Sequence, residues 1–354
     1  MSVRRPQAFD ETKPHRNEVA MTNRERMQAV LNGEKPDRLP AVEWATWWDL
    51  TTHAWEKQGA PKNDRLDVLQ EFYGLDGLRQ IWISPRAADC PAPAHNGAGL
   101  MEDEEGYAAL KPYLYPEASI DAAVQTALAW KEGHERGDYA QWLTLEGFFW
   151  FPRTLFGIEN HLYSFYDYPE LLHQINQDVT EYHLRCLERL LPVYRPEFMT
   201  FAEDMSYNLG PMLSKESFDA FMLPYYKKVI PLLKEYGVKV LIDTDGNVEP
   251  LIPWFMEAGI EGVLPLERQA GVDVNRIRQT YPEWIMIGGY NKLIMHLGEE
   301  AMREEFQRIF PAMKSGRYIP GVDHQTPPDV TVEQYKVYVR LLKEYGEKAA
   351  EEWI

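Results

Sequence analysis

Several acidic side chains and one histidine come directly after short buried runs of this sequence. Carboxylates that converge in one pocket repel one another, so they must be protonated, paired with cations or bound to a metal. Such groups could supply acid/base catalysis, or bind a metal or a cationic group. The residues at the ends of these runs are Glu43, Trp44, Glu146, Glu203, Asp204, Asp243, Asp245, Glu267, Tyr290, Asp323 and His324.

Two of the carboxylates also allow a purely structural interpretation. Asp243 and Asp245 are two residues apart, so both point inward only where a strand faces its interior or ends in a loop. Asp245-Gly246-Asn247 is equally typical of a turn that caps the following helix. His324 lies in a Pro-rich loop after the last buried run, where we expect it to face the same site as the carboxylates.

Aromatic residues cluster at two of the same positions along the chain. Most of them are expected to pack in the core and against helices. A subset placed after strand ends would form the wall of a pocket that suits a planar ring or a cationic group. The candidates for substrate binding are Trp44, Trp47, Trp48, Phe149 and Trp150.

The elements that must position these residues follow from the alternation of apolar runs with segments of helical period. Buried runs joined by helices are typical of parallel strands with right-handed crossovers. Eight runs predict an α/β fold, a single (β/α)8 TIM barrel, whose C-terminal strand ends share the active-site face. A doubly wound open sheet is the alternative, but no Gly-rich phosphate turn follows a first strand. The predicted strands are Arg38–Trp44, Leu78–Ser84, Gln141–Gly147, Phe198–Asp204, Val238–Thr244, Glu261–Glu267, Trp284–Tyr290 and Tyr318–His324.

The predicted helices and the N-terminal region complete this domain. Thr22 and Glu25 form a capping-box pattern that predicts an N-terminal helical extension ending near Gly33. Residues 1–20 are interpreted as a flexible tail and residues 21–354 as one barrel domain. The helices predicted between the later strands are Lys215–Tyr236, Val248–Ala258, Val274–Thr280 and Glu299–Met313.

The amino-acid composition argues against some classes of binding partner. The 354-residue chain has a net charge of −18 and shows no basic stripe, so we do not expect it to bind nucleic acid. No apolar run reaches the roughly 18 residues that span a bilayer, and the polar start lacks a secretory h-region. We therefore expect a cytoplasmic protein without a membrane segment. The two cysteines, Cys90 and Cys186, are in no metal-binding spacing.

A series of motifs resembles the uroporphyrinogen decarboxylase superfamily. The motifs run in order over nearly all of residues 21–354. The resemblance implies the barrel fold and one of two activities: cofactor-free decarboxylation of the acetate arms of uroporphyrinogen, or zinc-dependent methyl transfer between a corrinoid protein and a thiol or methylated substrate. The motifs are Thr22-Asn-Arg-Glu-Arg, Gly147-Phe-Phe-Trp150, Tyr166-Asp-Tyr-Pro-Glu170, Gly210-Pro-Met-Leu-Ser-Lys-Glu-Ser-Phe218, Asp245-Gly-Asn-Val248, Glu257-Ala-Gly-Ile-Glu-Gly262 and Pro327-Pro-Asp-Val330.

The sequence departs from both branches of the family at the diagnostic positions. The decarboxylases carry an Arg-rich motif after the first strand, where this chain reads Glu43-Trp-Ala-Thr-Trp-Trp48 without an arginine. An eight-carboxylate substrate needs a cationic floor, which an acidic mouth does not offer. The methyltransferases bind zinc through a His-x-Cys pair and a later Cys or His. Here the pair is Asp243-x-Asp245 and the later residue is His324, so the resemblance implies a metal site without thiolates, for zinc or a harder divalent ion.

The hypothesis that follows is a methyltransferase of the corrinoid-linked branch. It would move a methyl group between a small methylated substrate, such as a methoxylated aromatic or a methylated amine, and a corrinoid carrier protein. A homodimer is also expected, since barrels of this superfamily often pair. The alternatives are decarboxylation of a porphyrinogen-like acid and a barrel without catalysis that serves as a binding module. The residues assigned to catalysis are Glu146, Glu203, Asp204, Glu267 and Tyr290.

Overall fold

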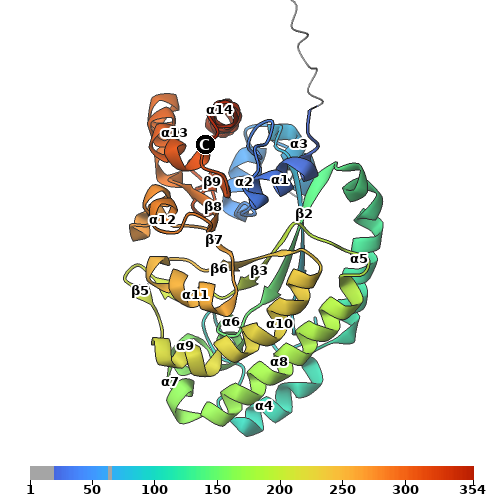
Figure 1. The fold of residues 1–354 in the computed structure, drawn as a ribbon. Helices are drawn as coiled ribbons and strands as arrows, with labels where there is room; N and C mark the ends of the chain where they lie inside the picture. Colours follow the sequence, from blue (N-terminus) through green and yellow to red (C-terminus); the bar gives the residue numbers. More distant parts are fainter. Residues whose placement is uncertain (1–19, 63–65) are drawn as a thin grey trace, which may run out of the picture.

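The computed structural model describes residues 20–62 and 66–354 of the chain (Figure 1). The tail expected over residues 1–20 therefore lies outside the described residues, except for Ala20. Within the described part no helix is long and apolar enough to cross a membrane.

Within the described residues, seven parallel strands form one sheet at the centre of the molecule. Their order in the sheet is the order along the chain, β1-β2-β3-β6-β7-β8-β9, so the doubly wound alternative, which needs a reversal of strand order, is excluded. A short antiparallel pair, β4 and β5, forms a separate ribbon after β3. The strands are β1 Gly77–Ile83, β2 Tyr139–Glu146, β3 Phe198–Ala202, β4 Ser206–Tyr207, β5 Gly210–Pro211, β6 Lys239–Asp243, β7 Gly262–Leu264, β8 Ile285–Tyr290 and β9 Tyr318–Val322.

The prediction of a strand at Arg38–Trp44 is wrong, and the closure of the TIM-like barrel by eight strands is not confirmed. This segment is assigned to no strand of the sheet. Pro40 has no N–H to donate, and the Ala41 N–H bonds the Asp76 carboxylate at 2.9 Å instead of a strand carbonyl. The segment still joins the two edge strands, because Ala41 O accepts from the Asp76 N–H and the Trp44 indole N–H donates to Val322 O at 2.7 Å. It occupies the place of an eighth strand without that strand's hydrogen bonds.

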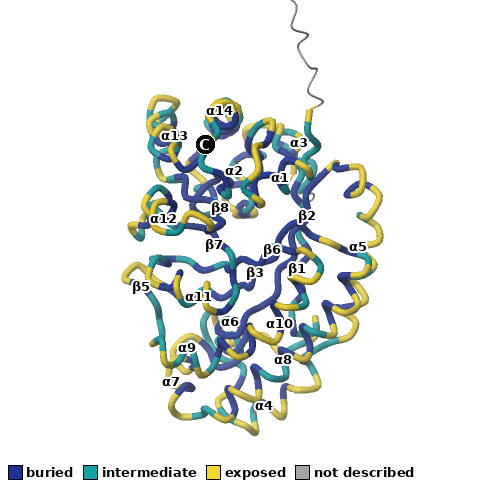
Figure 2. Tube along the Cα trace, in the orientation of Figure 1, coloured by how far each residue is buried: buried dark blue, intermediate teal, exposed yellow. Residues whose placement is uncertain are grey.

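Helices cover the outside of the sheet, and the strands are the most deeply buried part of the chain (Figure 2). Long helices such as α8, α10 and α14 pack along the outer surface (Figure 1). The α-helices are α1 Asn23–Asn32, α2 Asp49–Glu56, α3 Leu66–Tyr73, α4 Glu104–Leu110, α5 Glu117–Arg136, α6 Trp150–Phe156, α7 Ile158–Asp167, α8 Pro169–Leu190, α9 Lys215–Phe221, α10 Leu223–Glu235, α11 Ile252–Ala258, α12 Val274–Thr280, α13 Glu299–Met313 and α14 Val332–Glu351.

Local sequence signals explain where several helices begin and end. Thr22 and Glu25 form the predicted capping box of α1, and Gly33 ends the helix in the left-handed conformation. The predicted bounds of α12 and α13 are confirmed. The single helix predicted over Lys215–Tyr236 is two helices, because Pro224 cannot donate the N–H that would continue α9 through Met222.

Candidate functional site

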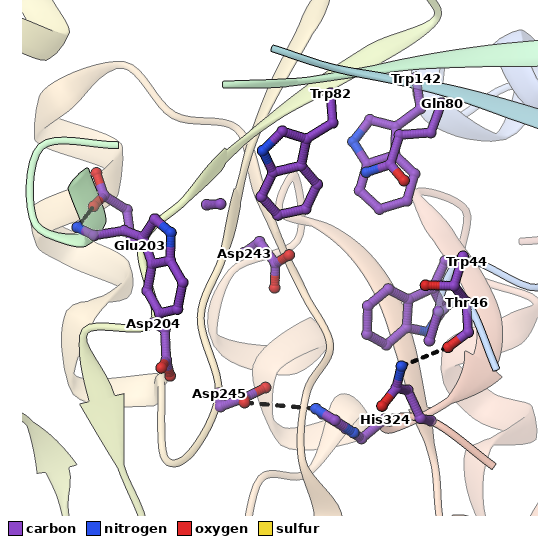
Figure 3. A pocket seen from close by; sticks show the side chains of 14 residues that line it. Trp44, Thr46, Gln80, Trp82, Trp142, Glu203, Asp204, Asp243, Asp245 and His324 are labelled. Carbon is purple, nitrogen blue, oxygen red and sulfur yellow. Dashed lines mark hydrogen bonds and ion pairs between the residues drawn. The ribbon is translucent and has the colours of Figure 1, made fainter. Parts of the chain in front are cut away.

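A cavity of about 320 Å³ opens at the C-terminal ends of the strands (Figure 3). Tryptophans and carboxylates dominate its wall. A second cavity of about 430 Å³ lies at the opposite, N-terminal ends of β6 and β8, away from the candidate residues. The first cavity is lined by Trp44, Ala45, Thr46, Gln80, Trp82, Trp142, Trp150, Ala202, Glu203, Asp204, Asp243, Asp245, His324 and Gln325.

The register of the strands shows which residues lie at the bottom of the cavity. Glu146, Ala202 and Asp243 are paired neighbours on β2, β3 and β6, so they lie at one level of the sheet. One level deeper, Thr144 and Thr200 share a hydrogen bond of 3.0 Å. The Thr144 hydroxyl accepts from Gln80, and the Thr200 hydroxyl accepts from the Trp142 indole. This hydrogen-bonded layer forms a fixed polar floor beneath the cavity.

Asp243 lies in the middle of the cavity wall, at the end of β6 (Figure 3). Its carboxyl group makes no hydrogen bond or ion pair with any described residue, while its backbone oxygen accepts from the Glu203 and Asp204 N–H groups. Burial raises the pKa of this carboxyl well above its ordinary value, and the nearby Asp245 and Asp204 raise it further. The pKa of Asp243 therefore lies above that of a free aspartate, and a cation placed beside the carboxyl would lower it.

Asp245, Glu267 and His324 form a cluster that could hold a metal ion. One ligand atom from each of the three lies within 4.8 Å of the others, and His324 Nε2 is 3.6 Å from Asp245 Oδ2. Glu267 is fixed by the Gly246 N–H at 2.9 Å, and burial followed by the Asp245 charge raises the pKa of Glu267. The predicted triad is thus brought together in part: Asp245 and His324 meet, but their third neighbour is Glu267 and not Asp243.

Asp204 faces the cavity from an uncommon backbone conformation. Its φ is +43°, in the left-handed region, and its carboxylate accepts from Arg153 Nη1 at 2.7 Å. The same guanidinium lies 5.2 Å from the centre of the Trp150 ring. Burial raises the pKa of Asp204, although the Arg153 charge acts in the opposite direction. Arg153 therefore fixes both an acidic and an aromatic part of the wall.

Glu203 reaches the cavity lining, but both of its oxygens are engaged in holding α6. They accept from the backbone N–H groups of Phe148 at 2.8 Å, Phe149 at 2.7 Å and Trp150 at 3.0 Å, and from the Tyr226 hydroxyl. Burial raises the pKa of Glu203 to about 7, although these hydrogen-bond donors lower it. This geometry gives Glu203 a positioning role for the first turn of α6.

Glu146 and Tyr290, both predicted as catalytic, are not among the residues that line the cavity. Glu146 is buried at the end of β2, with one oxygen 3.5 Å from Arg86 Nη2 and the other without a described partner. Tyr290 points away from the cavity, and its ring packs on Phe306 and Tyr338. The prediction that Tyr290 faces the mouth is wrong, because the last residue of β8 lies with its side chain on the helix-covered side.

The predicted aromatic residues divide between the cavity and the core. Trp44 and Trp150 line the cavity, and Trp48 is 41% exposed with its ring 6.3 Å from that of His324. Trp47 is buried against Trp55 and Tyr335. Phe149 is buried against His161 and Phe165.

Three lining residues on the first two strands were missed in the sequence, namely Gln80, Trp82 and Trp142. The alternation of Gln80 and Trp82 with Ile81 and Ile83 was a usable signal, since it places the first pair on one face of a strand and the isoleucines on the other. Arg153 was missed as well, because its partner Asp204 is 51 residues away in the chain.

Comparison with known proteins agrees with this architecture. The chain covers 99% of a methyltransferase from Methanosarcina mazei, with a TM-score of 0.65, 17% sequence identity and 92% of this chain aligned. A β-glycosidase from Thermosphaera aggregans aligns over 84% of this chain and 85% of its own, at a TM-score of 0.44 and 11% identity. No curated protein matches the sequence. The model of the uroporphyrinogen decarboxylase (URO-D) family matches residues 153–345, and this chain therefore belongs to that family.

Proposed function

We propose that this protein is a methyltransferase that moves a methyl group from a small methylated substrate in the cavity to a corrinoid on a partner protein. The observation that carries the proposal is the pairing of a metal-competent cluster, Asp245–Glu267–His324, with a tryptophan wall in one cavity at the strand ends. The similarity of fold to a protein described as a methyltransferase is consistent with it.

The donor set of this cluster fits a divalent metal. Two carboxylates and one imidazole give three protein ligands, as in catalytic sites that keep a position open for substrate. Asp245, Glu267 and His324 would hold the ion, and Asp323 with Lys292 would brace the surrounding loops through the Lys292 N–H, 3.0 Å from Asp323 Oδ1. Such an ion would act as a Lewis acid towards a lone pair of the substrate.

The same cavity argues against decarboxylation of a polycarboxylate. Among the residues that line it, only His324 could carry a positive charge, while four of them are acidic. The nearby guanidinium of Arg153 is already paired with Asp204. A substrate with many carboxylates would meet four acidic side chains in the wall, and the cost of burying its charges would exceed the gain from the available contacts.

The residues of the chain would bind and orient the methyl donor. The indoles of Trp44, Trp82 and Trp142 surround the space next to Asp243 and would exclude water from a bound methyl group (Figure 3). When the methyl group leaves, the bonding pair stays on the heteroatom of the substrate, and the acceptor supplies the pair for the new bond. The open face of the cavity leaves the methyl group accessible to a partner protein.

The test is a methyl-transfer assay with free cob(I)alamin as acceptor and a panel of methyl donors, followed by the absorption change on methylation. We expect at least one donor to react with the wild type, and His324→Ala and Glu267→Gln to lower the rate by about 100-fold or more. His296→Ala is the matched control, because His296 is an exposed histidine in the chain segment after β8 and is not a lining residue. Absence of methyl transfer from every donor, or equal rates in the three variants, would contradict the proposal.

A further inference from the structure

The wall of the cavity has a composition that few neutral ligands would require. Four of its residues are tryptophans, and three aspartates, Asp204, Asp243 and Asp245, face the same space. All four tryptophans precede residue 153, where the match to the family begins, whereas the three aspartates lie within the matched residues. The tryptophans are therefore the part of the wall that the family match does not cover.

The indole of Trp82 shows that the wall presents free aromatic faces. Trp82 is 49% exposed although it stands on strand β1, between the buried Ile81 and Ile83. Trp44 is oriented by its bond to Val322 O, and Trp142 by its bond to Thr200 and by stacking on Phe198 at 5.4 Å. The polar edges of these two rings are thus already satisfied, and their faces are what the cavity offers. Tryptophan faces are the strongest aromatic partners for cations.

The acidic side of the cavity supplies the matching charge. Asp243 lies among Trp44, Trp82 and Trp142 and has no hydrogen-bonding or ionic partner in the described chain (Figure 3). An anionic methoxylated aromatic acid would be repelled by Asp243 and Asp245, and a neutral ligand would leave these two aspartates without a counter-charge. A compact cation without N–H donors would satisfy both the aromatic faces and the aspartate at once.

From this geometry we infer that the methyl donor is an onium compound, a small molecule with a quaternary methylated ammonium group held between Trp44, Trp82, Trp142 and Asp243. The inference rests on the proposed function for the reaction, but the binding can be measured separately. In the reaction one C–N bond breaks, its electron pair stays on nitrogen, and a neutral tertiary amine is released. The methyl carbon bonds to the electron pair of a cobalt(I) corrinoid, so no proton and no further oxidant or reductant is needed.

This donor leaves the Asp245–Glu267–His324 cluster free for a different task. A quaternary nitrogen has no lone pair for a metal, so the cluster would bind a second polar group of the donor. His324 and Asp245 lie on the opposite side of Asp243 from Trp82 (Figure 3), which places the two subsites next to each other in one cavity. An onium compound with an oxygen-bearing tail fits this arrangement.

The experiment compares choline with 3,3-dimethylbutan-1-ol, which has the same shape but carries no charge. Calorimetry on the full-length protein should give an affinity for choline at least about tenfold higher than for the alcohol. Asp243→Asn and Trp82→Leu should each weaken choline binding about tenfold, and Asp243→Asn should leave the affinity for the alcohol within about twofold. Trp353→Leu is the control, because Trp353 contacts the Gly316 region at the other end of the sheet.

Each outcome of these binding measurements supports or contradicts the onium donor. Equal affinities for the two compounds, or no measurable binding of choline, would overturn the inference. If Trp82→Leu does not fold, Asp243→Asn alone separates charge from shape. Methyl transfer from a methoxylated aromatic without choline binding would leave the proposed function intact and refute the onium donor. Choline binding without methyl transfer from any donor would retain the cation site and refute the proposed function.

Discussion

At the scale of single residues, Gly147 is required by its distance from Glu203. A Cβ atom added to Gly147 would lie 2.0 Å from the Glu203 carboxyl carbon, far inside any tolerated contact. Gly147→Ala must displace Glu203 from the three N–H groups at the start of α6 and from Tyr226. We expect a loss of about 2 to 4 kcal/mol in the free energy of unfolding, measured by urea denaturation.

Gly346→Ala serves as the control for that substitution. Gly346 is inside α14, and an added Cβ would meet Leu39 at 3.4 Å, an ordinary contact. Alanine favours a helix more than glycine does, so this variant should be as stable as the wild type or more stable. An unchanged stability of Gly147→Ala would show that Glu203 can move at little cost and is not fixed in its positioning role.

Glu43 leads to a prediction about pH. It is 5% exposed, accepts from the Tyr335 hydroxyl at 2.7 Å, and burial raises its pKa to about 8. A carboxyl whose pKa is raised in the folded state costs stability as pH rises from its unfolded pKa, near 4.3, to about 8, because only the unfolded chain ionises freely. Glu43→Gln should therefore gain stability relative to the wild type between pH 5 and pH 8, by on the order of 4 kcal/mol at most.

Denaturation curves at several pH values in this window measure that gain. Glu333→Gln on the same helix as Tyr335 is a suitable control, because the Glu333 side chain is 83% exposed. It should show no comparable gain. A difference between Glu43→Gln and the wild type that stays constant from pH 5 to pH 8 would mean that Glu43 ionises in the folded protein as readily as in the unfolded one.

The residues that line the cavity were predictable from the sequence where they follow the end of a predicted strand. Asp243, Asp245, His324, Trp44 and Trp150 all lie at the cavity as expected. What the sequence did not reveal was the direction and the partners of a side chain. A carboxylate that follows an apolar run in the sequence can either face the active site or cap a buried helix. The sequence therefore did not show that Glu203 binds the N–H groups at the start of α6.

At the scale of elements, Asp76 holds the segment that stands in for an eighth strand. It is 7% exposed, accepts from Arg38 Nη1 and Nη2 at 2.8 and 2.6 Å, and accepts from the Ala41 N–H. Asp76→Ala would remove the shared acceptor of the Arg38 guanidinium and the Ala41 N–H, and a loss of about 3 to 5 kcal/mol in the free energy of unfolding is expected. Hydrogen exchange should rise first in the Ala41–Trp44 amides, and the cavity should lose the anchored position of Trp44.

The control for this prediction is Asp37→Ala. Asp37 also pairs with an arginine, Arg26 at 2.7 Å, but its side chain is 28% exposed, so its loss should cost much less. If Asp76→Ala unfolded the whole protein without a local increase of exchange in the segment, the segment would be a cooperative part of the sheet and not a separately held element.

The elements themselves were predictable to the extent that each carried its own signal. Seven of the eight predicted strands are present, since buried parallel strands are continuous apolar runs. The Arg38–Trp44 segment has the same composition, but its N–H groups donate to the Asp76 carboxylate and to Gly346 O of the distant α14. Its Ala41 carbonyl accepts from the Asp76 backbone N–H, and no local pattern contains these partners. The break between α9 and α10 was readable from Pro224.

At the scale of the whole molecule, the cavity depends on the complete sheet. Its lining runs from Trp44 to Gln325 and draws on the segments beside β1, β2, β3, β6 and β9, so partial folding cannot assemble it. A ligand of the Asp245–Glu267–His324 cluster, which joins the ends of β6, β7 and β9, would therefore stabilise the entire fold. A metal that binds only the folded state raises the free energy of unfolding by RT ln(1 + [L]/Kd), which is about 2.7 kcal/mol at a metal concentration 100 times Kd.

Thermal unfolding with added Zn²⁺ or Mn²⁺ measures this stabilisation directly. The melting temperature of the wild type should rise with metal concentration by a few degrees, on the order of 2 to 4 °C per kcal/mol for a chain of this size. In His324→Ala and Glu267→Gln the rise should be absent at the same concentrations, whereas His296→Ala should respond as the wild type does. A metal-dependent rise that persists in His324→Ala would place the ion elsewhere on this acidic protein, and the three residues would then serve only as neighbours in the wall of the cavity.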